Sequence, residues 1–335
     1  MTDIAHGLID ERIDKLERRL AREYSTALVD IKRKLNNYLK DFKKRDAKMR
    51  NDWLNGKITR TDYKNWRRNQ ILTGQRYNRL ILELSQDLTN VNTIARNMIY
   101  NSLANTFLDA ANYTAYELET MANSGTVDFI MYNKDAVYDL IKSDFNLLPP
   151  PSAIQAAVIA QKDIQWNMAK INSAITQGIL QGEAIGKIAS RLQMVTDMNR
   201  AQALRNARTL HTQAESKGRE QRYAEAEEMG IDIQREWLAV HDNRTRDAHR
   251  ELDGQIRPIG VPFENSIGKI MYPSDPEADP ANVYNCRCQL RGVIKGHEYK
   301  TDRYSRKGYE AWKRGKRAYT EYMARNDIQT KYGRF

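Results

Sequence analysis

The placement of proline constrains the fold of this 335-residue chain more than any other feature. Residues 1–148 contain no proline, three prolines stand together at Pro149–Pro151, and the other five lie between Pro258 and Pro280. Inside a helix, proline removes a backbone hydrogen bond and clashes with the preceding turn. The first 148 residues can therefore form long helices, whereas the segment from Pro258 to Pro280 is restricted to loops and short strands.

The N-terminal segment has the apolar spacing of one long amphipathic helix. From Ile9 to Phe42, apolar residues recur in steps of three and four, which places them on a single helical face. A stripe this long and narrow requires a partner helix, supplied by the same chain or by another. The sequence favours an antiparallel hairpin with the following helix over a coiled-coil oligomer.

Glycine and capping residues predict where the next helices begin. Gly56 and Thr59 break the first stripe, and Asp62 follows Thr59 at the spacing of a capping box. We expect a second helix from about residue 60 into the nineties and a third over roughly residues 96–122.

Helices are expected to resume near Ser152, after the proline linker, and to end at a C-cap glycine, Gly230. Breaks within this stretch are expected at three residues: Gly178, Gly182 and Thr196. Beyond Gly230 the spacing changes to that of extended strands. One strand candidate spans residues 231–240 and a second spans residues 290–294.

These patterns predict a mainly α protein, in which long N-terminal helices are followed by a small α+β module and a basic C-terminal tail. Four regions are expected: a helical N-terminal region with long amphipathic helices (1–148), a second helical region (152–230), the α+β module (231–296) and a basic, aromatic tail (297–335).

Positive charge is concentrated in two segments. The chain carries a formal net charge of +11; residues 32–79 hold 16 Lys or Arg against 4 Asp or Glu, and residues 295–335 hold 12 against 5. A polyanion or an acidic protein surface is the expected partner of such segments. The alternative is that these basic helices are only solvated.

The sequence lacks the features of a membrane protein or a disulfide-rich protein. No apolar run approaches the roughly 20 residues of a membrane-spanning helix. The N-terminus has no basic segment followed by an apolar stretch, which a secretory signal would need. Two cysteines, Cys286 and Cys288, do not make a disulfide framework. We therefore expect a protein without a membrane span, made in a reducing cytoplasm.

Both cysteines are candidate metal ligands. In an extended segment, residues two apart point to the same side, so Cys286 and Cys288 can offer two sulfurs to one zinc ion. His249 and a carboxylate, Asp242 or Asp253, would complete a tetrahedron. Two alternatives stay open: both cysteines are small buried residues of a strand, or they form a strained disulfide.

An enzymatic interpretation is weaker. A metal held near His249 can activate water in a hydrolase or nuclease, but a histidine beside acidic residues is more often structural. Arg244, Arg246 and Asp242 are expected to form a buried salt-bridge lattice that fixes a loop. The chain has neither a GxxxxGKS/T nor a GxSxG motif, and a nucleophilic role for Cys286 with His249 as base is disfavoured. We expect a protein that is not an enzyme.

Aromatic residues are interleaved with the basic residues of the tail. This composition suits single-stranded nucleic acid, and it equally suits an extension that docks in a groove of another subunit. The second interpretation is favoured because no nucleic-acid-binding fold signature accompanies the tail. The aromatic residues are Tyr299, Tyr304, Tyr309, Trp312, Tyr319, Tyr322, Tyr332 and Phe335.

A sequence of motifs covers about 60 residues of the module. The motifs are, in order, Trp237; Asp242-x-Arg244-Thr245-Arg246; His249-x-x-Leu252-Asp253-Gly254; Phe263; Tyr272-Pro273; Asp275-Pro276; and Asn285-Cys286-Arg287-Cys288. This order resembles the C-terminal signature of the phage head morphogenesis family, the minor head proteins similar to protein F of phage Mu. Weaker similarities to the same family precede this signature in residues 56–66, in residues 177–192 and at Ala207-Arg208-Thr209.

The resemblance implies a minor capsid protein. Such proteins are added near the portal vertex of the head, so the implied partners are the portal, major capsid and scaffold proteins. The implied location is the virion, after assembly in the host cytoplasm. The family is not established as enzymatic, although some members carry an appended toxin domain; here 47 residues follow Cys288. The chain also has Leu210 where members often have glutamate, which leaves in doubt any role of an acidic group there.

Overall fold

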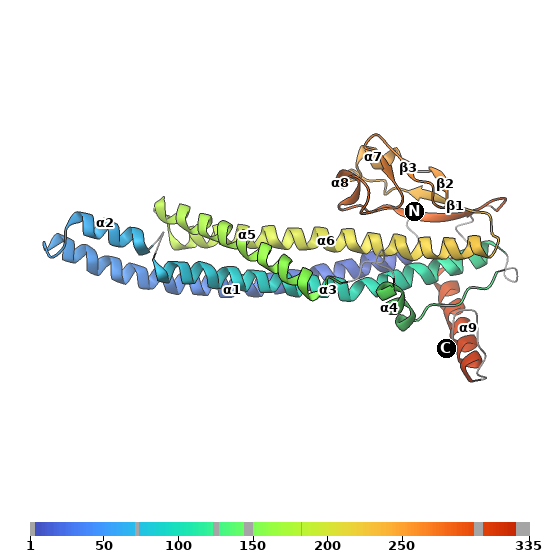
Figure 1. Cartoon of the computed structure of the whole chain (residues 1–335), viewed down its shortest axis with the longest axis horizontal. Coiled ribbons are helices and arrows are strands. Elements are labelled where there is room, and N and C mark those ends of the chain that lie inside the picture. Colours follow the sequence, from blue (N-terminus) through green and yellow to red (C-terminus); the bar gives the residue numbers. More distant parts are fainter. Residues whose placement is uncertain are drawn as a thin grey trace. The chain divides into compact units, whose positions relative to one another are not determined.

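The computed structural model describes residues 4–70, 74–122, 127–143, 150–181, 183–297 and 304–325. The chain forms two compact units, each assembled from separate stretches of sequence. Figure 1 shows its helices and strands. The first unit contains residues 1–15, 99–149 and 205–335, and the second contains residues 16–98 and 150–204. The fold is mainly helical with a small antiparallel sheet, which confirms the predicted fold class.

The second unit is built from five helices or parts of helices. They are residues 16–54 of α1 (Ile4–Leu54), α2 (Arg60–Arg68), residues 75–98 of α3 (Gln75–Met121), α5 (Ala153–Leu180) and residues 185–204 of α6 (Ile185–Glu228). Tyr24 of α1 donates a hydrogen bond to Asn92 of α3 (2.8 Å), and Lys34 pairs with Asp87 (2.6 Å). Because the partner numbers fall as the α1 numbers rise, the two helices are antiparallel, which confirms the predicted hairpin.

A chain of buried amide groups links the helices of this unit. Asn92 donates to Asn199 of α6 (2.7 Å), Asn199 donates to Asn167 of α5 (3.1 Å), and Asn167 donates to the hydroxyl of Thr89 on α3 (3.0 Å). Buried polar groups are costly unless they are paired. The network therefore favours one relative register of these helices.

The capping pattern at Thr59 was predicted correctly, but two expected breaks were not. The Thr59 hydroxyl accepts the N–H of Asp62 and the Asp62 carboxylate accepts the N–H of Thr59. In contrast, α3 is continuous through the nineties, because Ala95 keeps its apolar face buried. Thr196 also lies inside α6, where its hydroxyl donates to the Leu192 carbonyl (3.1 Å) and leaves the helix intact.

The expected break at Gly178 is also wrong, because this residue lies inside α5, and the helix expected from about residue 60 into the nineties is divided into α2 and α3. Two other boundaries agree with the structure. The break between α5 and α6 falls at residues 181–184, although Gly182 itself lies outside the described residues. Gly230 ends α6 with a φ of 85°, and the N–H of Ile231 reaches back to the Ala226 carbonyl (3.0 Å). This is the hydrogen bond of a Schellman cap.

In the first unit, α3 and α6 pack closely enough to require a glycine. A Cβ at Gly218 of α6 would lie 2.6 Å from the Phe107 carbonyl oxygen of α3. This unit also contains residues 4–15 of α1, α4 (Lys134–Ser143) and α9 (Arg306–Arg325).

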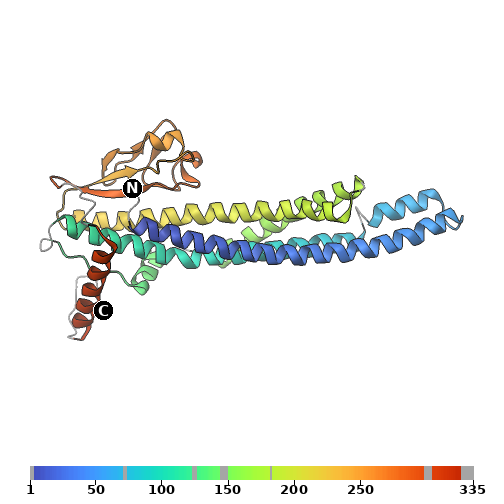
Figure 2. The same ribbon diagram turned by 180° about the vertical axis from the view of Figure 1, so that it is seen from behind.

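The α+β module lies against the C-terminal half of α6 in both views (Figures 1 and 2). A three-stranded antiparallel sheet has the order β2-β1-β5, with Trp237 opposite Leu290 in the central pair. The module contains β1 (Ile233–Leu238), α7 (Asp247–Arg250), β2 (Ile256–Pro258), β3 (Phe263–Glu264), β4 (Lys269–Ile270), α8 (Pro280–Val283) and β5 (Gln289–Ile294). Both predicted strands are present, as β1 and β5.

The described part of the tail packs on its own chain. Tyr309 of α9 is 2% exposed and meets Tyr113 edge-on, with ring centroids 5.2 Å apart. Trp312 contacts Tyr116, and its indole N–H donates to Glu119 (2.5 Å). These aromatic residues are covered intramolecularly, which corrects the expectation that they anchor in another subunit. Tyr299, Tyr332 and Phe335 lie outside the described residues.

None of the helices in the described ranges carries an apolar stretch able to span a lipid bilayer.

Candidate metal centre

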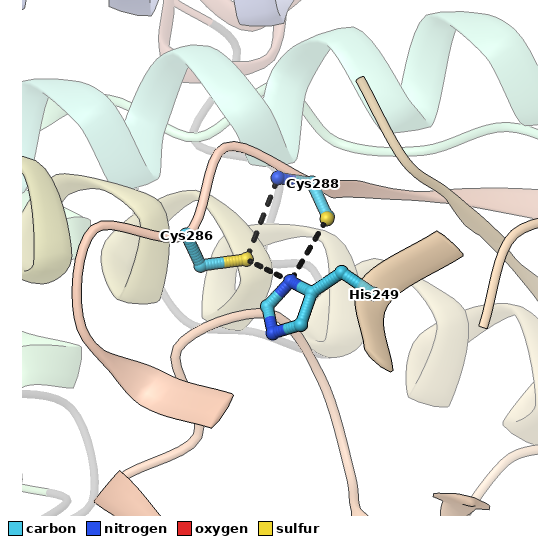
Figure 3. A group of neighbouring side chains, drawn as sticks. All are labelled: His249, Cys286 and Cys288. Atoms are coloured by element: carbon cyan, nitrogen blue, oxygen red, sulfur yellow. Dashed lines mark hydrogen bonds between the residues drawn. The ribbon is translucent and has the colours of Figure 1, made fainter. Parts of the chain in front are cut away.

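Three predicted ligands come together in the module (Figure 3). Nδ1 of His249, on α7, lies 3.4 Å from Sγ of Cys288 and 3.6 Å from Sγ of Cys286. The two cysteines flank Arg287 in the extended segment that leads into β5. Each of the three ligand residues is at most 3% exposed, and their ligand atoms all lie within 4.8 Å of one another.

These separations fit a tetrahedral zinc ion. Zinc–sulfur and zinc–nitrogen bonds of about 2.3 and 2.0 Å at a tetrahedral angle place sulfur and nitrogen about 3.5 Å apart. The two nitrogen–sulfur distances, 3.4 and 3.6 Å, lie on either side of that value. Both cysteines are free thiols in the structure, so the disulfide alternative is not the arrangement found.

Two threonines of α6 hold the cysteine loop in place. The Thr212 hydroxyl donates to the Cys286 carbonyl (2.8 Å), and the Thr209 hydroxyl accepts the N–H of Asn285 (3.1 Å). Asn285 has a φ of 56°, in the left-handed region that asparagine tolerates better than most residues. The turn at Asn285 directs both sulfurs toward α7.

On the side of the sheet, buried aromatic rings surround the centre. Trp237 is fully buried, and its ring meets the His249 ring edge-on at 6.0 Å and the Phe263 ring at 5.3 Å. Burial raises the pKa of the Cys286 thiol. Hydrogen bonds from Cys286 and His249 lower the pKa of Cys288, so Cys288 is the thiol that ionises first.

The outer nitrogen of His249 faces an arginine. Nη1 of Arg246 lies 3.4 Å from Nε2 of His249, and its other terminal nitrogen donates to the Tyr284 carbonyl. Arginine only donates, so this contact favours the tautomer with the proton on Nδ1, the form without a metal. If Nδ1 held a metal, Nε2 would carry the proton, and Arg246 could not donate to it.

Asp242 is not part of the three-ligand cluster. Its carboxylate accepts two hydrogen bonds from Arg287 (2.6 and 2.7 Å) and one from the backbone N–H of Arg244 (2.9 Å). The hydrogen bonds from Arg287 hold the pKa of Asp242 far below its ordinary range. The expected lattice with the Arg244 and Arg246 side chains is therefore wrong, because the guanidinium that fits this carboxylate bidentately is Arg287.

Three other motif residues support the loop around the centre. The Asp253 carboxylate accepts the N–H of Ala239 (2.7 Å) and pairs with the exposed His241 (3.0 Å). Gly254 takes a φ of 75° and donates to the Trp237 carbonyl (2.8 Å). The Thr245 hydroxyl donates to the Val240 carbonyl. Among the described residues, Asp253 is not part of the cluster of possible metal ligands.

The centre opens onto a cavity of about 240 Å³. Its walls contain all three candidate ligands together with four arginines, Arg208, Arg244, Arg246 and Arg287. His249, Cys286 and Cys288 would hold a metal at the wall of this cavity, and a zinc ion there could act as a Lewis acid.

Known proteins are similar in sequence to most of this chain. The family described as Phage Mu protein F like protein matches residues 169–291, which include the whole candidate centre. The minor head protein GP7 of Bacillus phage SPP1 is 26% identical over 297 residues, covering 86% of this chain and 85% of that protein. The chain is thus similar to phage minor head proteins.

A second relative of this chain is named as an enzyme. The NAD(+)–arginine ADP-ribosyltransferase EFV of Enterococcus faecalis is 30% identical over 172 residues, which cover 48% of this chain and 33% of that protein. The similarity spans about a third of that enzyme's length. No solved structure matches this chain.

The sequence did not predict the role of Thr212 or the pairing of Arg287 with Asp242. Thr209 belongs to the Ala-Arg-Thr motif that precedes the module, and Thr212 lies one turn further along α6. The three-residue spacing, which places both hydroxyls on one face of the helix, could have indicated Thr212. Arg287 was recognised only as the residue between the cysteines, and its partner Asp242 is 45 residues away in sequence.

Proposed function

We propose that this protein is a minor head protein, which binds portal or capsid subunits of a tailed phage during head assembly and remains in the virion head. The main support for this proposal is the sequence similarity to minor head protein GP7. It covers 86% of the chain and extends well beyond the motif region. Assembly in the host cytoplasm and a structural, non-enzymatic role are part of the same proposal.

Co-sedimentation with procapsids tests this role. Purified protein is mixed with procapsids assembled with and without portal, and the pelleted fraction is measured. Binding only to portal-containing procapsids supports a position at the portal vertex. Equal binding to both would favour capsid subunits over portal, and binding to neither would contradict the proposal.

Zinc is the metal proposed for the centre. Two thiolates and an imidazole are a typical zinc donor set, and the nitrogen–sulfur distances of 3.4 and 3.6 Å suit it. The metal would fasten α7 to the segment before β5, while Thr209 and Thr212 fasten that segment to α6. Metal analysis of the purified protein tests this. One zinc per chain, lost in a variant with both Cys286→Ser and Cys288→Ser, is expected.

A secondary contact with packaged DNA is proposed for the basic hairpin, residues 40–68. Two of its acidic side chains interact within the hairpin: Asp46 pairs with Arg67 (3.1 Å), and Asp62 caps α2. Exposed basic side chains on both helices remain to face a polyanion: Lys43, Lys44, Lys48, Arg50, Arg60, Lys64 and Arg68. Such binding is independent of DNA sequence and weakens steeply with salt.

Filter binding at increasing salt tests the DNA contact. Glutamine at Lys44, Lys48 and Lys64 should reduce the salt dependence and lower the affinity on every sequence alike. Glutamine at Lys295, Lys307 and Lys313 is the matched control for loss of charge elsewhere. An equal loss in both triple variants would contradict the assignment to the hairpin.

A metal-dependent hydrolase or nuclease is the second candidate. The observation that favours it is the cavity, onto which the three ligands open. It predicts metal-dependent turnover of a phosphodiester or peptide that is abolished in His249→Ala while the far-UV CD spectrum is unchanged. Loss of the fold in that variant would favour the structural role instead.

A further inference from the structure

Trp237 is the largest fully buried side chain among the described residues. Its ring is held between two other rings of the module, with centroids 6.0 Å from His249 and 5.3 Å from Phe263, and both contacts are edge-on. Packing of this kind fixes the orientation of an indole. It therefore also fixes the direction of the single N–H donor of Trp237.

The sheet places this indole beside one of the candidate ligands. Trp237 on β1 lies directly opposite Leu290 on β5. Cys288 precedes Leu290 by two residues, so the side chains of Cys288 and Leu290 share one face of the extended segment. Diagonal neighbours across an antiparallel pair are about 7–8 Å apart, within reach of an aromatic side chain. The Trp237 indole and the Cys288 side chain are accordingly in polar contact.

The Cys288 sulfur is the acceptor that this N–H can use. Nε1 of Trp237 is shielded from solvent and reaches no nitrogen or oxygen acceptor among the described residues, and its contact with the sulfur is looser than a full hydrogen bond. A buried N–H without an acceptor costs free energy. A thiol sulfur is a weak acceptor, whereas a sulfur bound to a metal carries negative charge and accepts N–H donors more strongly. Metal binding would therefore give the buried N–H a better acceptor.

We propose that Trp237 is a positioning residue of the metal centre, where its indole N–H donates to the metal-bound sulfur of Cys288. This inference rests on the proposed metal centre and adds to it a group that stabilises the loaded state. Partners outside the ligand set change metal affinity by roughly 10–100-fold. The alternative is that Trp237 only fills space in the core, in which case its shape matters and its N–H does not.

Replacement of Trp237 by the indole isostere benzothienylalanine separates these two roles, because the isostere keeps the two fused rings and lacks the N–H. The full chain is titrated with cobalt(II), whose thiolate charge-transfer absorption reports on the sulfur, and then with zinc in competition with a chelator. We expect the absorption to move to longer wavelength and both metals to bind about tenfold more weakly. Trp237→Phe should show the same changes. Wild-type absorption and affinity in the isostere would overturn the proposal.

Phe263→Leu is the matched control, because it removes a ring that packs on Trp237 and leaves the indole N–H in place. It should keep the wild-type charge-transfer wavelength, and thermal melting shows whether each variant is folded. An equal shift in Phe263→Leu and in the isostere would assign the effect to packing and overturn the role of the N–H. A wild-type chain that binds neither cobalt nor zinc would refute the metal centre itself, an outcome distinct from failure of the Trp237 assignment alone.

Discussion

Around the candidate centre, some polar side chains are held by partners far away in the sequence. Asp242 binds Arg287 across 45 residues, and Thr212 binds the Cys286 carbonyl across 74. The ligands themselves make few hydrogen bonds besides those with one another. Their positions therefore depend on the surrounding loop, and substitutions in that loop should alter metal affinity without touching a ligand.

Arg246→Gln should bind zinc about tenfold more tightly than wild type. The Arg246 guanidinium lies 3.4 Å from Nε2 of His249, where a metal-bound imidazole carries a proton. A glutamine oxygen can accept that proton's hydrogen bond, and outer partners of this kind change metal affinity by roughly 10–100-fold. Competition against a chromophoric chelator measures the affinity.

Arg244→Gln is the matched control for this measurement, because it removes the same charge from the cavity without removing a contact to His249. An equal gain in both variants would assign the effect to charge alone. Weaker zinc binding in Arg246→Gln would mean that this arginine does not oppose metal binding.

At the scale of elements, the contact between α3 and α6 in the first unit contains a neutral histidine. His211 is fully buried and hydrogen-bonds with Ser102 (3.0 Å) and Thr106 (2.7 Å). Burial, and secondarily the charge of Arg12, lowers the pKa of His211 from 6.5 to about 4. Protonation of this residue therefore favours unfolding.

The stability of wild type should fall as pH is lowered from about 6.5 to 4, and His211→Gln should lack this part of the fall. In that window the unfolded chain binds a proton at residue 211 and the folded chain does not, so the folded state loses up to about 3 kcal/mol, at roughly 1.4 kcal/mol per pKa unit. Urea unfolding at several pH values measures it. Parallel pH profiles for the two proteins would show that His211 is not the group responsible.

Docking of α9 depends on its buried aromatic residues. Tyr309→Ala should destabilise the packing of α9 by about 3 kcal/mol, as removal of a buried aromatic ring commonly does, because Tyr309 is 2% exposed. Limited proteolysis should then cleave within residues 306–325 faster than in wild type. Tyr319→Ala is the control on the same helix, since Tyr319 is 48% exposed. Equal cleavage rates in the two variants would show that α9 is not held by Tyr309.

At the scale of the whole molecule, local signals in the sequence predicted more than long-range ones. The capping box at Thr59 and the C-cap at Gly230 depend on residues a few positions apart, and both were identified. Cys286, Cys288 and His249 were also placed together, because their residue types share one chemistry. The resemblance to the phage head morphogenesis family indicated a class of function, which composition alone did not.

Two of the incorrect predictions concern partners distant in sequence. Asp242 had several arginines nearby in sequence, and only the folded loop selects Arg287. Tyr309 and Trp312 are interleaved with basic residues, and this composition does not indicate that the receiving surface is Tyr113 and Tyr116 of the same chain. The expected break in α3 was wrong for a related reason, since packing along the helix outweighed local spacing.

Removal of the metal should affect the two units differently. The candidate centre lies wholly in the first unit, where it joins α7 to the segment before β5. Chelation should therefore raise amide hydrogen exchange across residues 231–296, because the loops there lose a common anchor, and should leave residues 16–98 of the second unit unchanged. Mass spectrometry of exchanged peptides measures both in one sample, and the protein with both cysteines replaced by serine supplies the metal-free reference. Loss of protection spread evenly over both units would contradict a local role, and unchanged exchange everywhere would show that the fold does not use a metal.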